Sequence, residues 1–286
     1  GATGFRYFTT SSTEVDTGKA TSYNTISNCT ILGFWRAGWK SFGISGRNPD
    51  RGNVIRNCTM GTVDVPTGSG SDVRAVEADC QRDLTIANNT IKDINVAIMT
   101  TNNIYGIWLN PASSATNLNS GTINIYGNII KNLSNSGTTT TSGFAIGIAS
   151  NNVDTNTVFN IYNNMISDIY SNGSTTSRAV GIGLYVATAP NAVVNLYNNM
   201  VSNLRAPRAT SNPSVRGIDL QNLGGNGRFN VYNNSSYLNN DVPPTIAAHY
   251  SANLYWANFG TATLDLRNNI LVNTMSSQTG KSVNLY

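Results

Sequence analysis

Residues 195–201 have the sequence NLYNNMV, and close copies recur at 160–166 (NIYNNMI), 230–236 (NVYNNSS) and 265–271 (DLRNNIL). A looser form of the central step, an asparagine-rich pair that precedes an aliphatic segment, occurs eight times. The second residues of these pairs are Cys29, Cys58, Asn89, Asn128, Asn164, Asn199, Asn234 and Asn269. Successive copies lie 29 to 39 residues apart. Self-similarity at such a steady interval indicates a repeat architecture.

Each repeat contains three short segments with β-strand character. The segment before the asparagine pair alternates apolar and polar residues, as at 159–162, which places alternate side chains on opposite faces of a strand. A Gly-Ile segment such as 181–184 precedes it, and a third segment such as 165–169 follows the pair. Helical periodicity is lacking, and a propeller blade would need four strands per repeat. The sequence therefore predicts an all-β, right-handed parallel β-helix, a solenoid of about eight coils that forms one domain over residues 1–286.

The composition describes a neutral, polar surface. Charged residues are only 11% of the chain, whereas 43 residues are asparagine. Asparagines that recur at one corner of stacked coils are expected to hydrogen-bond from coil to coil. The net charge of +4 is spread without basic runs, which argues against a nucleic-acid partner. Because no stretch approaches the roughly 20 apolar residues of a membrane span, none is predicted.

Two longer stretches carry a family resemblance. Residues 195–207 with 214–218, and residues 263–273, resemble the β-helix repeats of large secreted proteins of Bacteroidetes. The resemblance covers roughly residues 84–286 and implies an extracellular or cell-surface location, reached by type IX secretion. It brings no activity or catalytic residues with it. The final residues 282–286 fit the first strand of a further coil, so we expect the chain to be a fragment of a longer protein.

Three cysteines and one histidine limit the nucleophilic and metal chemistry. Cys29 and Cys58 occupy the same corner in adjacent coils, where either a disulfide or a stack of thiols fits, and the parallel direction of their Cβ atoms favours thiols. Cys80, the third cysteine, takes part in neither arrangement. His249 is the only histidine, and no cysteine or histidine cluster has metal-ligand spacing. No metal or cofactor is therefore predicted from these residue types.

Glu77 and Asp79 are the strongest candidates for catalysis. When Val76 is aligned with Ile107 and Ile44, the two acids point outward from one strand, about 6.6 to 6.8 Å apart. That separation suits an inverting glycosidase. The same register places Arg47 one coil before, and Trp108 and Asn110 one coil after. Such a group could hold and cleave a sugar or bind Ca²⁺, but two solvated surface acids are the favoured interpretation.

Four tyrosines form a second candidate surface, because they take the same outward position in consecutive coils. They are Tyr126, Tyr162, Tyr197 and Tyr232. Stacking that supports the sheet is the favoured interpretation, and a flat platform for sugar rings is the alternative.

These features favour a non-enzymatic function. We expect a structural or adhesive module of an extracellular or cell-surface protein, with a polysaccharide or cell-surface glycan as the candidate ligand. One alternative is a polysaccharide hydrolase or lyase that uses Glu77 and Asp79 in a groove on one face of the helix. A second alternative is a self-assembling surface or filament component, because an uncapped coil end could add to another sheet edge.

Overall fold

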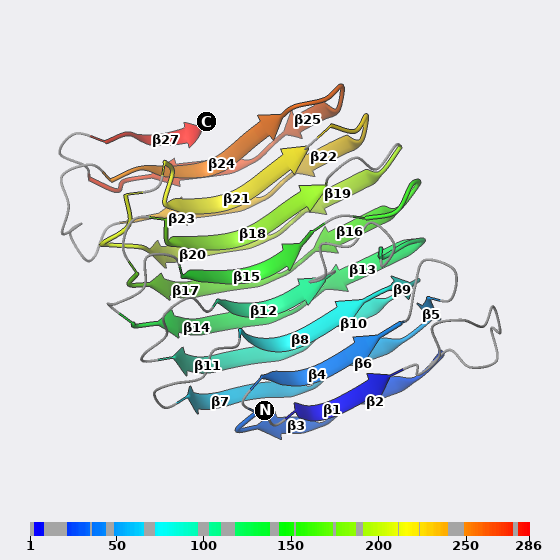
Figure 1. Ribbon diagram of the computed structural model, residues 1–286. Helices are drawn as coiled ribbons and strands as arrows, with labels where there is room; N and C mark the ends of the chain where they lie inside the picture. The colour runs from blue at the N-terminus through cyan, green and yellow to red at the C-terminus, as the bar shows by residue number, and fades with distance from the viewer. Residues whose placement is uncertain are drawn as a thin grey trace.

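The computed structural model describes most of the chain as a stack of parallel strands (Figure 1). The described residues are 3–8, 22–34, 36–43, 49–65, 72–96, 103–109, 118–137, 143–151, 153–173, 176–186, 191–210, 212–222, 224–239, 249–276 and 280–286. Within them there are 27 strands and no helix. The strands stack as a β-solenoid whose first and last strands lie at opposite ends (Figure 1).

Three long parallel sheets form the walls of the solenoid, and each coil contributes a strand to each wall in turn. Sheet A consists of β1 (Thr3–Phe8), β4 (Ala37–Phe42), β8 (Val73–Asp79), β12 (Ile104–Leu109), β15 (Phe144–Ser150), β18 (Arg178–Val186), β21 (Val215–Asn222), β24 (Ser251–Asn258) and β27 (Ser282–Leu285). Sheet B consists of β2 (Thr25–Ser27), β6 (Val54–Arg56), β10 (Thr85–Ala87), β13 (Thr122–Tyr126), β16 (Val158–Tyr162), β19 (Val193–Tyr197), β22 (Arg228–Tyr232) and β25 (Thr263–Arg267). Sheet C consists of β3 (Thr30–Leu32), β7 (Thr59–Val65), β11 (Thr90–Val96), β14 (Ile129–Asn135), β17 (Met165–Ser171), β20 (Met200–Arg205), β23 (Ser235–Leu238) and β26 (Ile270–Asn273). A small fourth sheet pairs β5 (Asp50–Arg51) with β9 (Gln81–Arg82).

The expected parallel β-helix with three strands per coil is confirmed. Alternation fills the interior: in β16 the side chains of Phe159 and Ile161 are fully buried, while Asn160 between them is half-buried on the outer face. Equivalent core positions stack in register, so that Ile161 pairs with Leu196 of the next coil. Each such buried aliphatic side chain contributes about 1.5 to 3 kcal/mol relative to an exposed one. A single coil cannot bury both faces of its strands, so stability arises between neighbouring coils.

The asparagine pair has two separate structural tasks at the corner between sheets B and C. The first residue takes the left-handed conformation, as at Asn163 with φ of 55°, which asparagine tolerates better than most residues. The second forms an internal ladder: Asn164 Nδ2 donates to Asn199 Oδ1 at 2.9 Å and to the Ile125 carbonyl at 3.0 Å. The full ladder comprises Asn89, Asn128, Asn164, Asn199, Asn234 and Asn269. The expected coil-to-coil hydrogen bonding is therefore confirmed.

Cysteines replace the ladder asparagine in the first two coils. Cys29 and Cys58 are thiols and do not form a disulfide, which settles the two alternatives in favour of the stack. The Cys58 amide donates to Asn89 Oδ1 at 3.0 Å, so the ladder ends on its backbone. Burial raises the pKa of the Cys58 thiol.

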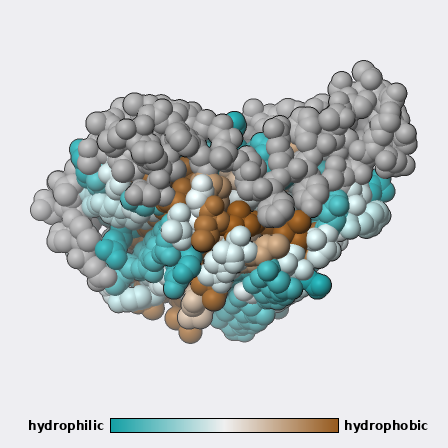
Figure 2. All heavy atoms as spheres, turned by 90° about the horizontal axis from the view of Figure 1, so that it is seen from below, coloured by the Kyte–Doolittle hydropathy of each residue, from teal (hydrophilic) through white to brown (hydrophobic). Residues whose placement is uncertain are grey.

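The ends of the solenoid expose apolar side chains at positions that a neighbouring coil covers in the middle of the solenoid. Seen along the axis from the N-terminal end, apolar atoms lie between polar flanks (Figure 2). At the other end, 37% of Leu266 and 54% of Leu285 are exposed, whereas their partners one coil earlier, Val231 and Leu254, are buried. Leu266 and Leu285 lie on β25 and β27, which are edge strands in the described part of the chain.

Candidate functional site

Glu77 and Asp79 lie together on β8, on the face opposite the core side chains of Val76 and Ala78. Both are buried, with exposures of 1% and 0%. They are therefore not the solvated surface acids that the sequence favoured. Nor are they open to a polymer, because almost none of either side chain faces solvent.

The Glu77 carboxylate is held by two cations. Lys40 Nζ from β4 and Arg74 Nη1 from the same strand each lie 2.8 Å from its Oε1 atom. The Arg74 guanidinium also lies 4.0 Å from the centre of the Trp108 ring on β12. Burial alone would raise the pKa of Glu77, but the charges and hydrogen bonds of Arg74 and Lys40 outweigh it and lower that pKa.

Asp79 lies in a different environment. No side chain in the described part of the structure donates to its oxygens, and the nearby Cys80 backbone is the one hydrogen-bonding group that favours its ionised form. Burial, together with the nearby charge of Glu77, raises the pKa of Asp79 to about 7. The pair thus combines a Glu77 carboxyl group whose pKa is lowered with an Asp79 carboxyl group whose pKa lies near neutrality, the separation that an acid and base pair needs. Substrate access, rather than acidity, is what this pair lacks.

The predicted neighbours of the acids are only partly correct. Trp108 pairs with Glu77 in the next coil, as expected. The register one coil before is wrong, because Val76 pairs with Trp39 and not with Ile44, so Lys40 is the residue beside Glu77 and Phe42 the residue beside Asp79. The Gly-Ile pair at 43–44 imitated the strand pattern, whereas the true equivalent, Gly38-Trp39, has a tryptophan in the aliphatic position. Arg47 and Asn110 lie outside the described residues.

The same arrangement occurs a second time on sheet A. Arg216 and Asp219 on β21 repeat the spacing of Arg74 and Glu77, with 2.6 Å between Nη1 and Oδ2. Arg216 lies 4.0 Å from the centre of the Tyr255 ring in the next coil, as Arg74 lies over Trp108. Asp219 occupies the column of Glu77 four strands away, as the register predicted. The recurrence of the motif favours a structural role for the ion pair on the outer face of sheet A.

The tyrosine column is present in the predicted register. The centres of Tyr126 and Tyr162 lie 4.9 Å apart and those of Tyr162 and Tyr197 4.8 Å apart, with the rings nearly parallel. Tyr232 donates instead to Asp265 Oδ2 at 2.7 Å. Since the stacked rings cover one another's faces, mainly their edges and hydroxyl groups remain for a ligand. This geometry supports the sheet-stacking interpretation and gives the sugar platform little surface.

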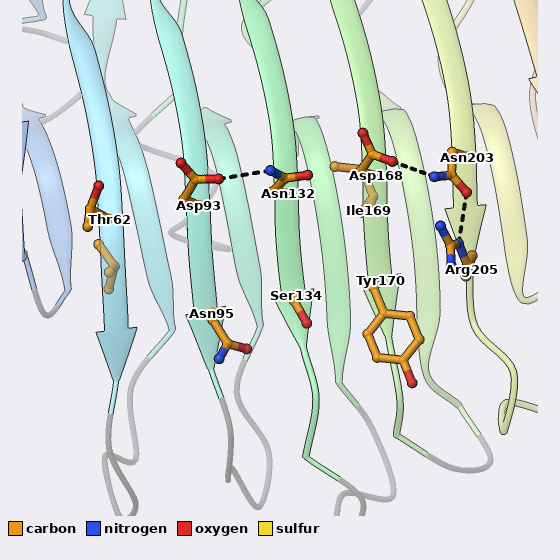
Figure 3. A pocket seen from close by; sticks show the side chains of 11 residues that line it. Thr62, Asp93, Asn95, Asn132, Ser134, Asp168, Ile169, Tyr170, Asn203 and Arg205 are labelled. Carbon is orange, nitrogen blue, oxygen red and sulfur yellow. Dashed lines mark hydrogen bonds between the residues drawn. The ribbon is translucent and has the colours of Figure 1, made fainter. Parts of the chain in front are cut away.

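An open groove of about 660 Å³ follows the outer face of sheet C, and sequence analysis did not identify it. The groove, called groove C below, is lined by Thr62, Val63, Asp93, Asn95, Asn132, Ser134, Asp168, Ile169, Tyr170, Asn203 and Arg205. Its floor is a row of side chains across neighbouring strands, with a second row beside it (Figure 3). The first row contains Asp93, Asn132, Asp168 and Asn203, and the second contains Asn95, Ser134 and Tyr170.

A bend in five strands of sheet C, β7, β11, β14, β17 and β20, creates the groove. In each of them the fourth residue after the asparagine-pair position is left-handed, with φ between 50° at Thr62 and 57° at Asp168. These residues are skipped in the strand register, because Lys92 pairs with Lys131 and Ile94 with Leu133 while Asp93 has no partner position. A left-handed residue at the same position in successive coils interrupts the extended backbone and turns each strand at that point. The recurrence of Asn or Asp four places after the ladder residue was the signal available in the sequence.

Side-chain hydrogen bonds connect the floor of groove C. Asn132 Nδ2 donates to Asp93 Oδ1 at 2.8 Å, and Asn203 Nδ2 donates to Asp168 Oδ1. Arg205 Nε in turn donates to Asn203 Oδ1 at 2.8 Å. The groove therefore presents fixed amides, carboxylates and one guanidinium to solvent, next to the Tyr170 ring.

Neither a metal cluster nor a membrane helix occurs in the described parts of the chain. No group of three or more histidine, cysteine, aspartate or glutamate residues is placed to share a metal ion there. No helix in those parts is long and apolar enough to cross a membrane.

Comparisons with protein families, with curated proteins and with solved structures found no match to this chain. The β-helix fold thus stands on the structure itself, and the narrower resemblance to secreted Bacteroidetes proteins remains an expectation.

Proposed function

We propose that this chain is a repeat module of an extracellular or cell-surface protein, and that it binds a carbohydrate chain along groove C without cleaving it. The observation that carries the proposal is the open groove itself, which crosses four or more neighbouring strands of sheet C with polar groups at repeated positions. A polymer of similar units suits a surface that repeats at each coil.

The lining of groove C suits hydroxyl groups. Amide side chains can both donate to and accept from a sugar hydroxyl, and carboxylates accept strongly. Tyr170 offers an apolar ring with a polar tip at the side of the groove, the kind of surface on which a sugar ring packs. The floor is prearranged by its own hydrogen bonds, such as that from Asn132 to Asp93, so binding need not order it.

Binding in groove C can be tested with a glycan array, followed by titration calorimetry of the full chain with the best oligosaccharide. We expect Tyr170→Ala to weaken that binding by about tenfold or more, because the sugar ring loses the aromatic face on which it packs. A tenfold loss of affinity corresponds to about 1.4 kcal/mol. Tyr162→Ala, in the tyrosine column of sheet B, is the matched control and should change binding by less than about twofold. Equal losses in both variants, or no binding to any glycan, would refute the proposal.

Hydrolysis or lysis of a polysaccharide by Glu77 and Asp79 is less well supported, since both side chains are buried. An experiment separates it from simple binding. If the unaltered chain depolymerises any neutral or acidic polysaccharide and Glu77→Gln with Asp79→Asn abolishes that activity, the non-enzymatic proposal is wrong. Calcium binding at the same acids has a direct test, because Ca²⁺ should then raise the melting temperature of the unaltered chain and not of this double variant.

A further inference from the structure

A column of asparagines on the outer face of sheet B forms a continuous hydrogen-bonded ladder, which serves as a structural reference for the column in groove C. Asn160 Nδ2 donates to Asn124 Oδ1 at 3.0 Å, and Asn195 Nδ2 donates to Asn160 Oδ1 at 2.9 Å. Asn230 continues the series to Asn195 at 2.8 Å. Each amide gives its NH₂ group to the preceding coil and offers its carbonyl to the following one, so the chain of bonds is continuous.

The column on the floor of groove C has the same direction but is interrupted. Asn132 and Asn203 donate to the preceding coil, as on sheet B, yet aspartate occupies the alternate positions. A carboxylate accepts hydrogen bonds but cannot donate one. Asp168 therefore cannot pass a hydrogen bond back to Asn132, and none joins the two residues in the described structure, where the Asn–Asp pairs stand as separate units (Figure 3).

The interruption leaves two acceptors facing each other across one coil step. Because the NH₂ group of Asn132 is committed to Asp93, its Oδ1 atom must be the end directed toward Asp168. The Asp168 oxygens already accept from Asn203 and from Ser167 Oγ, the latter at 2.7 Å. Coils in a parallel sheet are about 4.8 Å apart, so one donor group can fit between the carbonyl of Asn132 and the carboxylate of Asp168.

Asp168 is also the uncompensated charge of the groove. Asp93 has Lys92 Nζ at 3.6 Å, whereas Asp168 forms no salt bridge among the described residues. Arg205, the only cation that lines groove C, donates its Nε to Asn203 rather than to Asp168. An asparagine at position 168 would complete the ladder. Breaks in an otherwise consistent local pattern are expected at functional or strained sites.

We propose that groove C selects an amino sugar, whose ammonium group binds between Asn132 Oδ1 and the Asp168 carboxylate. This inference rests on the proposed carbohydrate binding and specifies its ligand class. An ammonium group supplies up to three donors and a positive charge, which matches two acceptors of which one is a carboxylate. A hydroxyl group would satisfy the acceptors but not the charge.

Titration calorimetry of the full chain with three oligosaccharides of equal length tests the selectivity. The probes are a β-1,4-glucosamine oligomer, its N-acetylated form and a neutral β-1,4-glucose oligomer, all at pH 6, where the amine is protonated. We expect the glucosamine oligomer to bind at least tenfold more tightly than the other two, and this advantage to shrink as salt is raised. Equal affinities would overturn the inference and leave the proposed function intact, whereas no binding by any probe would overturn both.

The variant Asp168→Asn tests whether the break in the hydrogen-bonded column causes the preference for the glucosamine oligomer. The variant should bind all three oligomers alike and should melt at a higher temperature, because its ladder is complete, so lost binding would not reflect misfolding. Asp93→Asn is the matched control, since it leaves the acceptor for Asn132 in place, and it should reduce the preference by less than threefold. A preference for glucosamine that survives Asp168→Asn would show that the ammonium group is bound elsewhere.

Discussion

Asp79 has an internal counterpart in Gln221 on β21, and the two differ because the Gln221 side chain can donate a hydrogen bond whereas an ionised Asp79 cannot. Gln221 stands two residues after Asp219 on β21, as Asp79 stands two residues after Glu77 on β8. Gln221 Nε2 donates to Asp219 Oδ1 at 2.9 Å, and Tyr185 supplies another donor at 3.1 Å. At the first site a carboxyl group replaces the amide, and no side chain donates to its two oxygens in the described structure. Buried polar atoms without partners are rare and destabilising.

Asp79 should therefore make the stability of the chain depend on pH. An unfolded aspartate has a pKa near 3.9, whereas folding raises the pKa of Asp79 to about 7. Between these values the native state holds a proton that the unfolded state has lost, so the free energy of unfolding falls as pH rises from about 4 to about 7. The decrease levels off above that window and amounts to at most about 4 kcal/mol at ~1.36 kcal/mol per pKa unit.

Asp79→Asn should remove this loss, because the amide has no charge to bury. We expect the variant to be more stable than the unaltered chain at pH 8 by roughly 2 kcal/mol, and nearly equal to it at pH 5. Urea unfolding at both pH values measures the difference. Asp219→Asn is the matched comparison and should instead destabilise the chain, since it leaves Arg216 buried without its carboxylate. An unchanged pH dependence in Asp79→Asn would show that Asp79 does not hold the proton.

At the scale of the strand, the sequence predicted pairing better than bending. Alternation identifies strands such as β16 and β19 directly, because one face is buried and the register follows from the repeat. The bend in sheet C was not predicted, since asparagine and aspartate occur in loops, ladders and left-handed positions alike. The recurrence of asparagine or aspartate four places after the ladder residue singles out Asp168, but residue type alone does not identify its left-handed φ of 57° or its place on the floor of groove C. The prediction that Glu77 and Asp79 are solvated was wrong for a related reason. Alternation shows that a side chain points outward, but its burial depends on what packs over it.

The two asparagine ladders should respond differently to the same substitution. Asn164 is buried, and its NH₂ group donates to two oxygens. Asn164→Asp removes both donors and buries a charge against acceptors, so we expect a loss of at least about 3 kcal/mol in the free energy of unfolding. Asn160→Asp, on the half-buried ladder of sheet B, should cost only about 1 kcal/mol, because water can hydrate the carboxylate. Chemical unfolding of the two variants checks this ratio, and similar losses would mean that the internal ladder is not a special element.

For the whole molecule, the important property is that each coil is supported only by its neighbours. Pairing in all three long sheets joins strands of adjacent coils, so the middle coils have support on two sides and the end coils on one. The end coil formed by β25, β26 and β27 also exposes Leu266 and Leu285, whose partners one coil earlier are buried. Local opening should therefore begin at the ends and proceed inward.

Hydrogen exchange can test this gradient in the 286-residue chain. Amides of β16, β17 and β18 should exchange at least about tenfold more slowly than those of β25, β26 and β27, a difference of ~1.4 kcal/mol in opening free energy.

The same measurement tests self-assembly, because an end coil that stacks on a second copy of the chain gains the neighbouring coil that it lacks in the monomer. If β25 to β27 become protected as protein concentration rises, and Leu266→Lys abolishes that protection, the ends associate. Protection that is graded and independent of concentration supports a monomeric solenoid, whereas uniform protection at all concentrations would show that the coils open together.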